Sequence, residues 1–372
     1  MKISEVKSRV LCAPLREPWK IANATMSKMY ATLVYLKSDS GLVGVGECLT
    51  RLAPFALANI VEEVLAPILL GRDPFVVERL WEEMYGVMRA RGHSKGFMIE
   101  AISGVDIALW DLIGKTLEQP IHRLLGSYSS SPLPAYASSI LFKEEKAMVE
   151  EAEGLAEAGF SGIKLKIGMG LQQDLANVRS LRRALGDGIE LMVDANCGYD
   201  RIFALRMGRE LEGMGISWME EPLPPEDLEG YAMLSQALDL PIAAGESEFT
   251  RYGFRELIGK GKVDVIQPDV ARAGGITECR RIAALASAYG IPCAPHTGAS
   301  SAVSIAASLQ LSASLPNFLT FEYMYAPNPL REEILVAPIS LTSDGRVPVP
   351  SGPGLGIELD EGRLEKFTLG KS

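Results

Sequence analysis

Cysteine is scarce in this sequence, and long apolar runs are missing. The five cysteines are odd in number and scattered, with no C-x-x-C pair, which argues against a disulfide framework or a zinc site and favours a reducing compartment. Residues 1–20 lack the apolar segment of a secretion signal, and no apolar run reaches the length that spans a bilayer. These absences predict a cytoplasmic protein with no membrane partner.

Basic clusters and nucleotide-binding glycine motifs are also missing. The formal net charge is −10, and no block of Lys or Arg stands out, so nucleic acid is not an expected partner. No G-x-G-x-x-G follows an early strand candidate, and no P-loop is present. The fingerprints of dinucleotide-binding and P-loop enzymes are therefore absent.

The chain does contain enough apolar sequence for a sizeable core. It has 372 residues, of which 47% are hydrophobic and 23% charged, as in ordinary globular enzymes. Strand candidates occupy 1–12, 29–38 and 42–48, and residues 54–117 have helical apolar spacing with breaks near 71–74 and 91–95. We therefore expect an N-terminal α+β domain over residues 1–125.

From residue 134 onward, short apolar strands alternate with helical stretches. The strand candidates are 134–139, 162–168, 189–196, 216–222, 241–247, 263–270, 291–296 and 318–323. This alternation predicts a parallel β/α barrel over residues 126–322, with a doubly wound open sheet as the main alternative. Residues 323–372 are irregular and rich in Pro and Gly, and we expect them to pack back on the N-terminal domain.

Seven of these strand candidates end in an ionisable side chain. The carboxyl ends of barrel strands meet at one mouth, where the chemistry of this fold gathers. In chain order the residues are Lys164 and Lys166, Asp194, Glu220 with Glu221, Glu246, Asp269, His296 and Glu322. A helix cap explains one such residue, but the whole set at one end predicts an active site.

Three of these carboxylates predict a metal site. Asp194, Glu220 and Glu246 are equally spaced, about one strand–helix unit apart, and converging carboxylates repel unless a cation lies between them. Oxygen ligands favour Mg²⁺ first and Mn²⁺ second. Only one of Glu220 and Glu221 can face the barrel interior, and the equal spacing favours Glu220.

Two candidate bases would flank this metal. Lys164 and Lys166 share one face of a strand. On an open sheet they would be surface lysines, but in a barrel they would lie beside the metal, where desolvation and the cation lower a lysine pKa toward neutrality. His296 would lie opposite, oriented by Asp269. Such a pair suits abstraction of a proton next to a metal-bound carboxylate.

Taken together, these motifs resemble the enolase superfamily, specifically its mandelate racemase subgroup, the mandelate racemase/muconate lactonizing enzyme family. The resemblance covers nearly the whole chain and rests on K-x-K at 164–166, DAN at 194–196, WMEEP at 218–222, GES at 245–247, IQPDVARAGGIT at 266–277 and PHT at 295–297. It implies a modified TIM barrel, (β/α)7β, with an N-terminal capping domain. It also implies a homo-oligomer, either a dimer or an octamer.

The resemblance further implies a role for each site residue. The residues that match Mg²⁺ ligands are Asp194, Glu220 and Glu246. The residues that match the acid/base machinery are Lys166, His296 and its partner Asp269. The residues that match contacts to the substrate carboxylate, the substrate or the enediolate are Lys164, Asn196 and Glu322.

The predicted function is Mg²⁺-dependent abstraction of the proton alpha to a carboxylate, giving a metal-stabilised enediolate from a small-molecule carboxylate substrate. Segments 328–339 and 347–360 resemble acid-sugar dehydratases and sugar-lactone cycloisomerases, so dehydration of an acid sugar or cycloisomerisation of a lactone is expected. The alternatives are racemisation or epimerisation of a 2-hydroxy acid and dehydration of a hydroxyproline-like acid. More distant ones are a Schiff-base aldolase and a non-catalytic barrel.

Substrate specificity is expected to come from the capping domain. Loops at Trp19–Ser27 and Thr50–Phe55 would close over the barrel mouth, where Trp19, Lys20 and Arg51 would meet a polar, anionic substrate. An ordinary surface or packing role is equally open for each of these three residues.

Overall fold

The N-terminal part of the computed structural model, which describes residues 1–129 and 132–370, is built on an antiparallel sheet. Its strands β1 (Ile3–Ile21), β2 (Ala24–Ser38) and β3 (Val43–Cys48) pair in that order. The expectation of a loop at 19–27 is wrong, because this segment is the tip of the β1–β2 hairpin. A register shift between Pro14 and Trp19 explains the difference, since a bulge breaks the alternation that marks a strand in a sequence.

Helices cover one face of this sheet, with the breaks that the sequence predicts. They are α1 (Pro54–Asn59), the π-helical η1 (Ile60–Leu65), α2 (Ala66–Leu69), the 3-10 turn η2 (Pro74–Val76), α3 (Val77–Arg89), α4 (Phe97–Thr116) and α5 (Ile121–Leu124). α4 lies so close to β3 that a Cβ on Gly44 or Gly46 would clash with its backbone. Among the described residues, no single helix is long and apolar enough to cross a membrane; one bent pair, 54–69 with 74–89, passes that test jointly.

The second sheet is the predicted parallel barrel. Its strands are β4 (Ala135–Ile140), β5 (Gly162–Lys166), β6 (Glu190–Asp194), β7 (Ile216–Glu220), β8 (Ile242–Ala244), β9 (Val265–Ile266) and β10 (Phe321–Met324), in the order β10-β4-β5-β6-β7-β8-β9. The candidate strand 291–296 forms single parallel bridges instead, from Cys293 to Ile266 and Phe318. Pro292 and Pro295 lack the N–H groups that a full ladder needs, yet the segment still occupies the position between β9 and β10.

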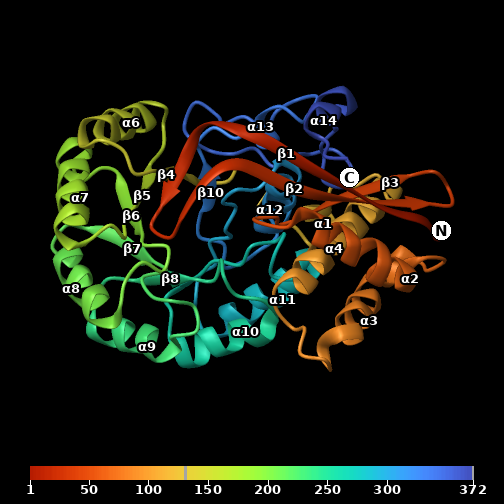
Figure 1. The fold of residues 1–372 in the computed structure, drawn as a ribbon, viewed down its shortest axis with the longest axis horizontal. Helices are drawn as coiled ribbons and strands as arrows, with labels where there is room; N and C mark the ends of the chain where they lie inside the picture. Colours follow the sequence, from red (N-terminus) through yellow and green to blue (C-terminus); the bar gives the residue numbers. More distant parts are fainter. Residues whose placement is uncertain (130–131, 371–372) are drawn as a thin grey trace.

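Helices surround the barrel strands, and the C-terminal tail returns to the N-terminal sheet (Figure 1). The helices are α6 (Glu145–Glu157), α7 (Leu171–Leu185), α8 (Arg201–Glu212), α9 (Leu228–Ala237), α10 (Thr250–Glu256), η3 (Leu257–Gly261), α11 (Gly275–Ala288) and α12 (Ala302–Ser312), followed by α13 (Pro329–Glu332) and α14 (Glu361–Phe367) in the tail. Arg9 of β1 forms ion pairs with Glu361 and Glu365 of α14.

The barrel interior is apolar below the polar strand ends. A buried cluster joins Met192, Trp218 and Ala294 to residues of the neighbouring strands. Each of these three residues lies two positions before a predicted site residue, and so faces the same way. The apolar cluster therefore forms a floor, and the polar groups above it face the barrel mouth.

Candidate active site

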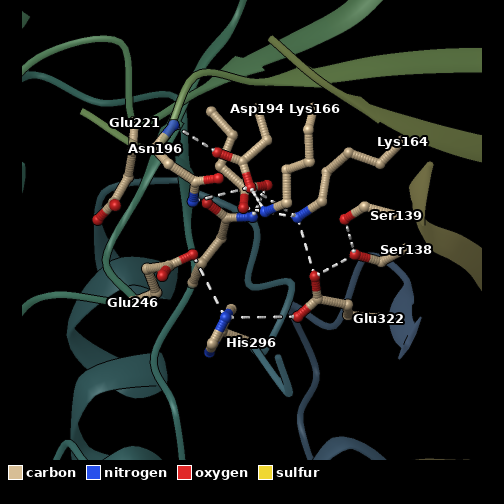
Figure 2. Close-up of polar contacts among 12 residues, drawn as sticks. Ser138, Ser139, Lys164, Lys166, Asp194, Asn196, Glu221, Glu246, His296 and Glu322 are labelled. Atoms are coloured by element: carbon tan, nitrogen blue, oxygen red, sulfur yellow. Dashed lines mark hydrogen bonds and ion pairs between the residues drawn. The ribbon is translucent and has the colours of Figure 1, made fainter. Parts of the chain in front are cut away.

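The parallel register of the strands brings the predicted site residues to one level. Lys166 at the end of β5 is paired with Asp194 at the end of β6, which is paired in turn with Glu220 at the end of β7. Glu246 follows β8, and His296 is bridged to Asp269 after β9. Figure 2 shows the side chains of this cluster pointing toward one another.

Both lysines of the K-x-K motif point into the barrel. The exposed fraction of Lys164 is 0% and that of Lys166 is 6%, so the alternative of surface lysines is wrong. The Lys164 amine donates to Glu220 Oε1 at 2.6 Å and to Glu322 Oε1 at 2.8 Å, and Lys166 forms an ion pair with Asp194. The two cations are thus held by carboxylates of three strands.

The three predicted metal ligands form a compact oxygen site. One carboxylate oxygen from each of Asp194, Glu220 and Glu246 lies within 4.8 Å of the other two, and all three residues are buried. Second partners fix two of these groups: the Asn196 N–H donates to Asp194 Oδ1 at 2.8 Å, and the Gln267 amide donates to Glu220 Oε2 at 2.6 Å. This donor set, all oxygen and densely charged, fits a hard divalent ion such as Mg²⁺.

The lysines and the carboxylates shift one another's pKa values. Burial lowers the pKa of Lys164, but the charges of Glu220 and Glu322 outweigh burial and raise it well above the ordinary value. In the metal-free protein the pKa of Lys164 is thus raised, opposite to the shift expected beside a bound cation. Burial raises the pKa of Asp194, but Lys166 and Lys164 outweigh it and lower that pKa to about 2. For Glu220 burial prevails and raises the pKa to about 8.

His296 lies across the cluster from the lysines and is held by acidic groups. Its Nδ1 donates to Asp269 Oδ2 at 2.7 Å, and its Nε2 lies 3.3 Å from Glu246 Oε2. Burial lowers the pKa of His296, but the charges of Glu246, Glu322 and Asp269 outweigh burial and raise it to about 9. The Ala271 N–H donates to the other Asp269 oxygen at 2.8 Å, so the carboxylate that orients the ring is itself fixed.

Glu322 on β10 lies between the lysine side and the histidine side of the cluster (Figure 2). Besides Lys164, its carboxylate accepts from Ser138 Oγ at 2.7 Å and from the Thr297 N–H at 2.6 Å. Burial raises its pKa, but Lys164 and His296 outweigh burial and lower it. Glu322 is thus placed to link the two sides of the cluster.

A cavity of about 340 Å³ lies above the cluster, and the hairpin tip lines part of it. Lys166, Glu246, His296 and Glu322 line it, together with three predicted substrate residues, Trp19, Asn196 and Arg51. Of the other two predicted substrate residues, Lys164 is fully buried beneath the cavity, and Lys20 lines a neighbouring cavity of about 500 Å³ with Arg16 and Lys143. Trp19 borders both cavities.

The structure places further residues in this cavity. Cys197, which directly follows Asn196 and is expected from that place to line the site, does line it, and so do Glu221 and Arg272, to which sequence reasoning assigned no role. Asn196, Cys197 and Glu221 have φ values of 42°, 59° and 36°, a region that costs a non-glycine residue energy and often marks a functional site. No sequence pattern reports that conformation. The sequence did contain a pointer to Arg272, because this residue lies three positions after Asp269 in the motif at 266–277 that carries the family resemblance.

Two family models match the chain. The N-terminal domain of mandelate racemase/muconate lactonizing enzyme matches residues 4–126, and the enolase C-terminal domain-like model matches residues 147–363. The chain is 36% identical to a D-galactarolactone cycloisomerase from Agrobacterium fabrum over 99% of each chain. It is also 36% identical to an arabinonate dehydratase from Saccharolobus solfataricus over 89% of each.

The fold is shared with solved structures over the whole chain. A racemase from Streptomyces coelicolor A3(2), described with bound magnesium, has a TM-score of 0.91 and is 30% identical over 99% of this chain and 100% of that one. That magnesium agrees with the chemistry of the carboxylate site described above.

Proposed function

The chain belongs to the mandelate racemase/muconate lactonizing enzyme family of the enolase superfamily, and on this premise we propose that it abstracts the proton alpha to the carboxylate of an acid sugar or a sugar lactone. The observation that supports this most is the arrangement of two basic groups around one carboxylate site. Lys166 and His296 both line the cavity and contact different members of the carboxylate triad.

In this proposal the charges around the cavity bind and polarise the substrate carboxylate. Asp194, Glu220 and Glu246 would hold Mg²⁺, which as a Lewis acid stabilises negative charge developing on the carboxylate. Lys164, buried beside the same site, contributes a fixed positive charge. Glu322, whose pKa is lowered despite burial by Lys164 and His296 in the metal-free protein, would hydrogen-bond the substrate carboxylate or the enediolate after taking up a proton.

The proton balance needs one base and one acid. Either Lys166 Nζ or His296 Nε2 removes the α-proton, and the other group delivers a proton. In a dehydration, the bond to the β-hydroxyl breaks, water leaves, and the enol becomes a 2-keto-3-deoxy acid. In a cycloisomerisation, the bond from the β-carbon to the lactone oxygen breaks instead, and no water leaves. Asp269 keeps the His296 ring oriented throughout.

The named relatives favour elimination over the alternatives. The same two bases would serve a racemase or epimerase, but a cycloisomerase and a dehydratase are among the relatives that match over most of the chain. A Schiff-base aldolase uses a lysine nucleophile and needs no metal, so the converging carboxylates of Asp194, Glu220 and Glu246 count against it. The predicted homo-oligomer, the cytoplasmic location and the division at residues 125 and 322 stay predictions.

Solvent exchange tests the proposal directly. Purified protein with Mg²⁺ is incubated in D₂O with a panel of acid sugars and their lactones, and proton NMR follows the α-carbon and any new product. We expect deuterium at the α-carbon of recovered substrate, or at C3 of a keto-deoxy or ring-opened product, and loss of both with a chelator. Lys166→Met and His296→Asn should abolish turnover, whereas Lys146→Met, at an exposed position, should not.

If one of the two base variants still exchanges the α-proton, the base that remains in that variant is the group that removes the proton. Full turnover in both base variants would contradict the two-base model. Unchanged turnover after chelation would contradict the metal site.

A further inference from the structure

Asp174 is a buried carboxylate that the proposed chemistry does not use. It lies in the first turn of α7, and its exposed fraction is 0%. Its Oδ2 accepts from the N–H groups of Gly168 at 3.1 Å and Gly170 at 2.9 Å and from the Tyr199 hydroxyl at 2.8 Å. Its Oδ1 accepts from the Met169 N–H at 3.2 Å. Four donors therefore converge on one carboxylate, and hydrogen bonds to a charged acceptor are stronger than neutral ones.

The three backbone contacts do not serve α7 itself. A residue that caps a helix accepts from N–H groups of that helix, whereas residues 168–170 precede α7, which begins at Leu171. Gly168 and Gly170 have φ values of 115° and 130°, a region that glycine enters without steric cost. A segment with this freedom needs a partner to fix one conformation, and Asp174 accepts from all three of its N–H groups.

The segment 168–170 continues the strand that carries Lys166. β5 ends at Lys166, and the ladder to β6 continues for one more bond, from the Ile167 N–H to the Asp194 carbonyl at 2.8 Å. The next three N–H groups along the chain then donate to Asp174. Lys166 thus lies where the strand gives way to a loop whose path Asp174 sets.

Tyr199 extends this arrangement to the loop after β6. It is buried and follows Asn196, which lines the cavity. The two loops are in contact, because a Cβ on Gly198 would lie 3.2 Å from the Gly168 Cα. Through backbone N–H groups on one side and the tyrosine hydroxyl on the other, Asp174 holds together the loops that follow two neighbouring barrel strands.

We propose that Asp174 is a positioning residue for Lys166, which fixes the direction from which the Lys166 amine reaches the substrate. The inference rests on the proposed function, in which Lys166 exchanges a proton with the substrate. The direct partner of Lys166 is Asp194, which would also bind Mg²⁺. An orienting contact outside the metal site is therefore needed, and the segment 168–170 provides it.

The histidine side of the site does not depend on this carboxylate. His296 comes from segment 291–296, and Asp269 orients its ring. Within the residues that the structure describes, Asp174 makes no hydrogen bond to His296, to Asp269 or to the carboxylate triad. Loss of Asp174 should therefore impair proton transfer by Lys166 and spare both the histidine and the metal site.

The substitution Asp174→Asn tests the proposal, because it removes the charge and leaves one acceptor oxygen in place of two. We expect kcat to fall by about 30-fold, since a small misplacement of a reacting group costs up to about 100-fold, and KM to stay within about 3-fold. Amide hydrogen exchange of residues 168–170 in the metal-free protein should become faster. Mg²⁺ affinity in isothermal titration should stay within about 2-fold, well below the 10- to 100-fold that direct partners of metal ligands contribute.

Asp111→Asn is the matched control for a purely structural loss. Asp111 is a buried carboxylate of α4 that also accepts from backbone N–H groups, those of Val45 and Leu355. This variant should lower the melting temperature and leave kcat unchanged. If Asp174→Asn folds poorly, Tyr199→Phe removes a single hydrogen bond to Asp174 and should lower kcat by about 3-fold.

The two base variants separate positioning of Lys166 from a general loss of activity. If His296→Asn still exchanges the α-proton, Lys166 is the base, and adding Asp174→Asn should lower that exchange by about 30-fold. If Lys166→Met still exchanges it, His296 is the base, and adding Asp174→Asn should leave that exchange within about 2-fold. A large fall in the Lys166→Met background would overturn the proposal, because no lysine remains there to be positioned.

The positioning role and the proposed function fail in different ways. Unchanged hydrogen exchange at 168–170 in Asp174→Asn, or a kcat no lower than that of Asp111→Asn, would overturn the role of Asp174 while the proposed function stands. A loss of Mg²⁺ affinity as large as that of kcat would show that Asp174 acts through the metal site instead. If the wild-type protein exchanges the α-proton of no acid sugar or lactone, the proposed function itself is wrong.

Discussion

Glu246 and Glu248 are two residues apart and differ in what their carboxylates meet. Glu246 belongs to the oxygen triad, whereas Glu248 pairs with Lys95 at 2.7 Å. We predict that Glu246→Gln weakens Mg²⁺ binding by at least about 100-fold, because even partners of metal ligands contribute 10- to 100-fold. Isothermal titration of each variant measures this, with Glu248→Gln as the matched control. Equal affinities in both variants would remove Glu246 from the ligand set.

The pKa of His296 is a second property that depends on its immediate partners. In metal-free protein we expect its NMR titration midpoint near 9, and a midpoint at least about one unit lower in Asp269→Asn, because the variant loses an opposite charge. The chain has three histidines, so single substitutions of His93 and His122 assign the signal. A wild-type midpoint at or below 6.5 would contradict the structure.

The same shift has a consequence for stability. Because the folded pKa of His296 lies above its unfolded value of 6.5, its contribution to stability is complete below pH 6.5 and is lost as the pH rises through about 9. The unfolding free energy of the metal-free protein should therefore fall over that window more steeply than that of His296→Asn.

At the scale of elements, the β1–β2 hairpin tip is attached to the barrel by small contacts. The Asn23 amide donates to the Asn196 carbonyl at 2.9 Å. A Cβ on Gly168 would lie 2.6 Å from the Ala22 methyl, and one on Gly198 would lie 3.1 Å from it. The two glycines thus leave the space that the tip occupies. Gly198 directly follows Cys197, which lines the cavity.

We predict that Asn23→Ala loosens this tip. One lost hydrogen bond should raise KM by about 2- to 10-fold with little change in kcat, since the tip lines the cavity but supplies no reacting group. Hydrogen exchange of residues 19–27 should become faster. Ser27→Ala, at an exposed position of β2, is the matched control. Unchanged exchange in Asn23→Ala would mean that other contacts hold the tip.

At the scale of the whole molecule, buried carboxylates of the N-terminal part bind backbone N–H groups of the barrel and the tail. Glu47 on β3 accepts from the N–H groups of Ser301 and Ser304 at the start of α12. Asp106 on α4 accepts from the N–H of Thr277 in α11, and Asp111 from that of Leu355. Helix N-termini favour such negative partners, so these contacts join the two parts of the chain.

We therefore expect the N-terminal part and the barrel to unfold in one transition. Calorimetry and near-UV circular dichroism should give the same midpoint for the wild-type protein. Glu47→Ala should lower that midpoint, because it leaves two buried N–H groups at the start of α12 without their acceptor, each costing about 1–3 kcal/mol. Two separate transitions in the wild-type protein would contradict this coupling.

The sequence alone predicts the barrel and the carboxylate site because both follow from periodicity. Side chains alternate across each strand, and the strand–helix unit repeats at regular intervals. Asp194, Glu220 and Glu246 therefore lie at the same end of a parallel sheet. The convergence of these three carboxylates then follows from the barrel topology rather than from detailed packing, and the structure confirms that they lie together.

The tertiary structure decided what depends on contacts between segments distant in the chain. The hairpin at 19–27, the left-handed backbone of Cys197 and Glu221, and the bridges of segment 291–296 carry no period that a sequence displays. The raised pKa of Lys164 comes from carboxylates on β7 and β10. Arg51 and Arg272 lie more than two hundred residues apart and share a cavity only because the N-terminal part folds over the barrel mouth.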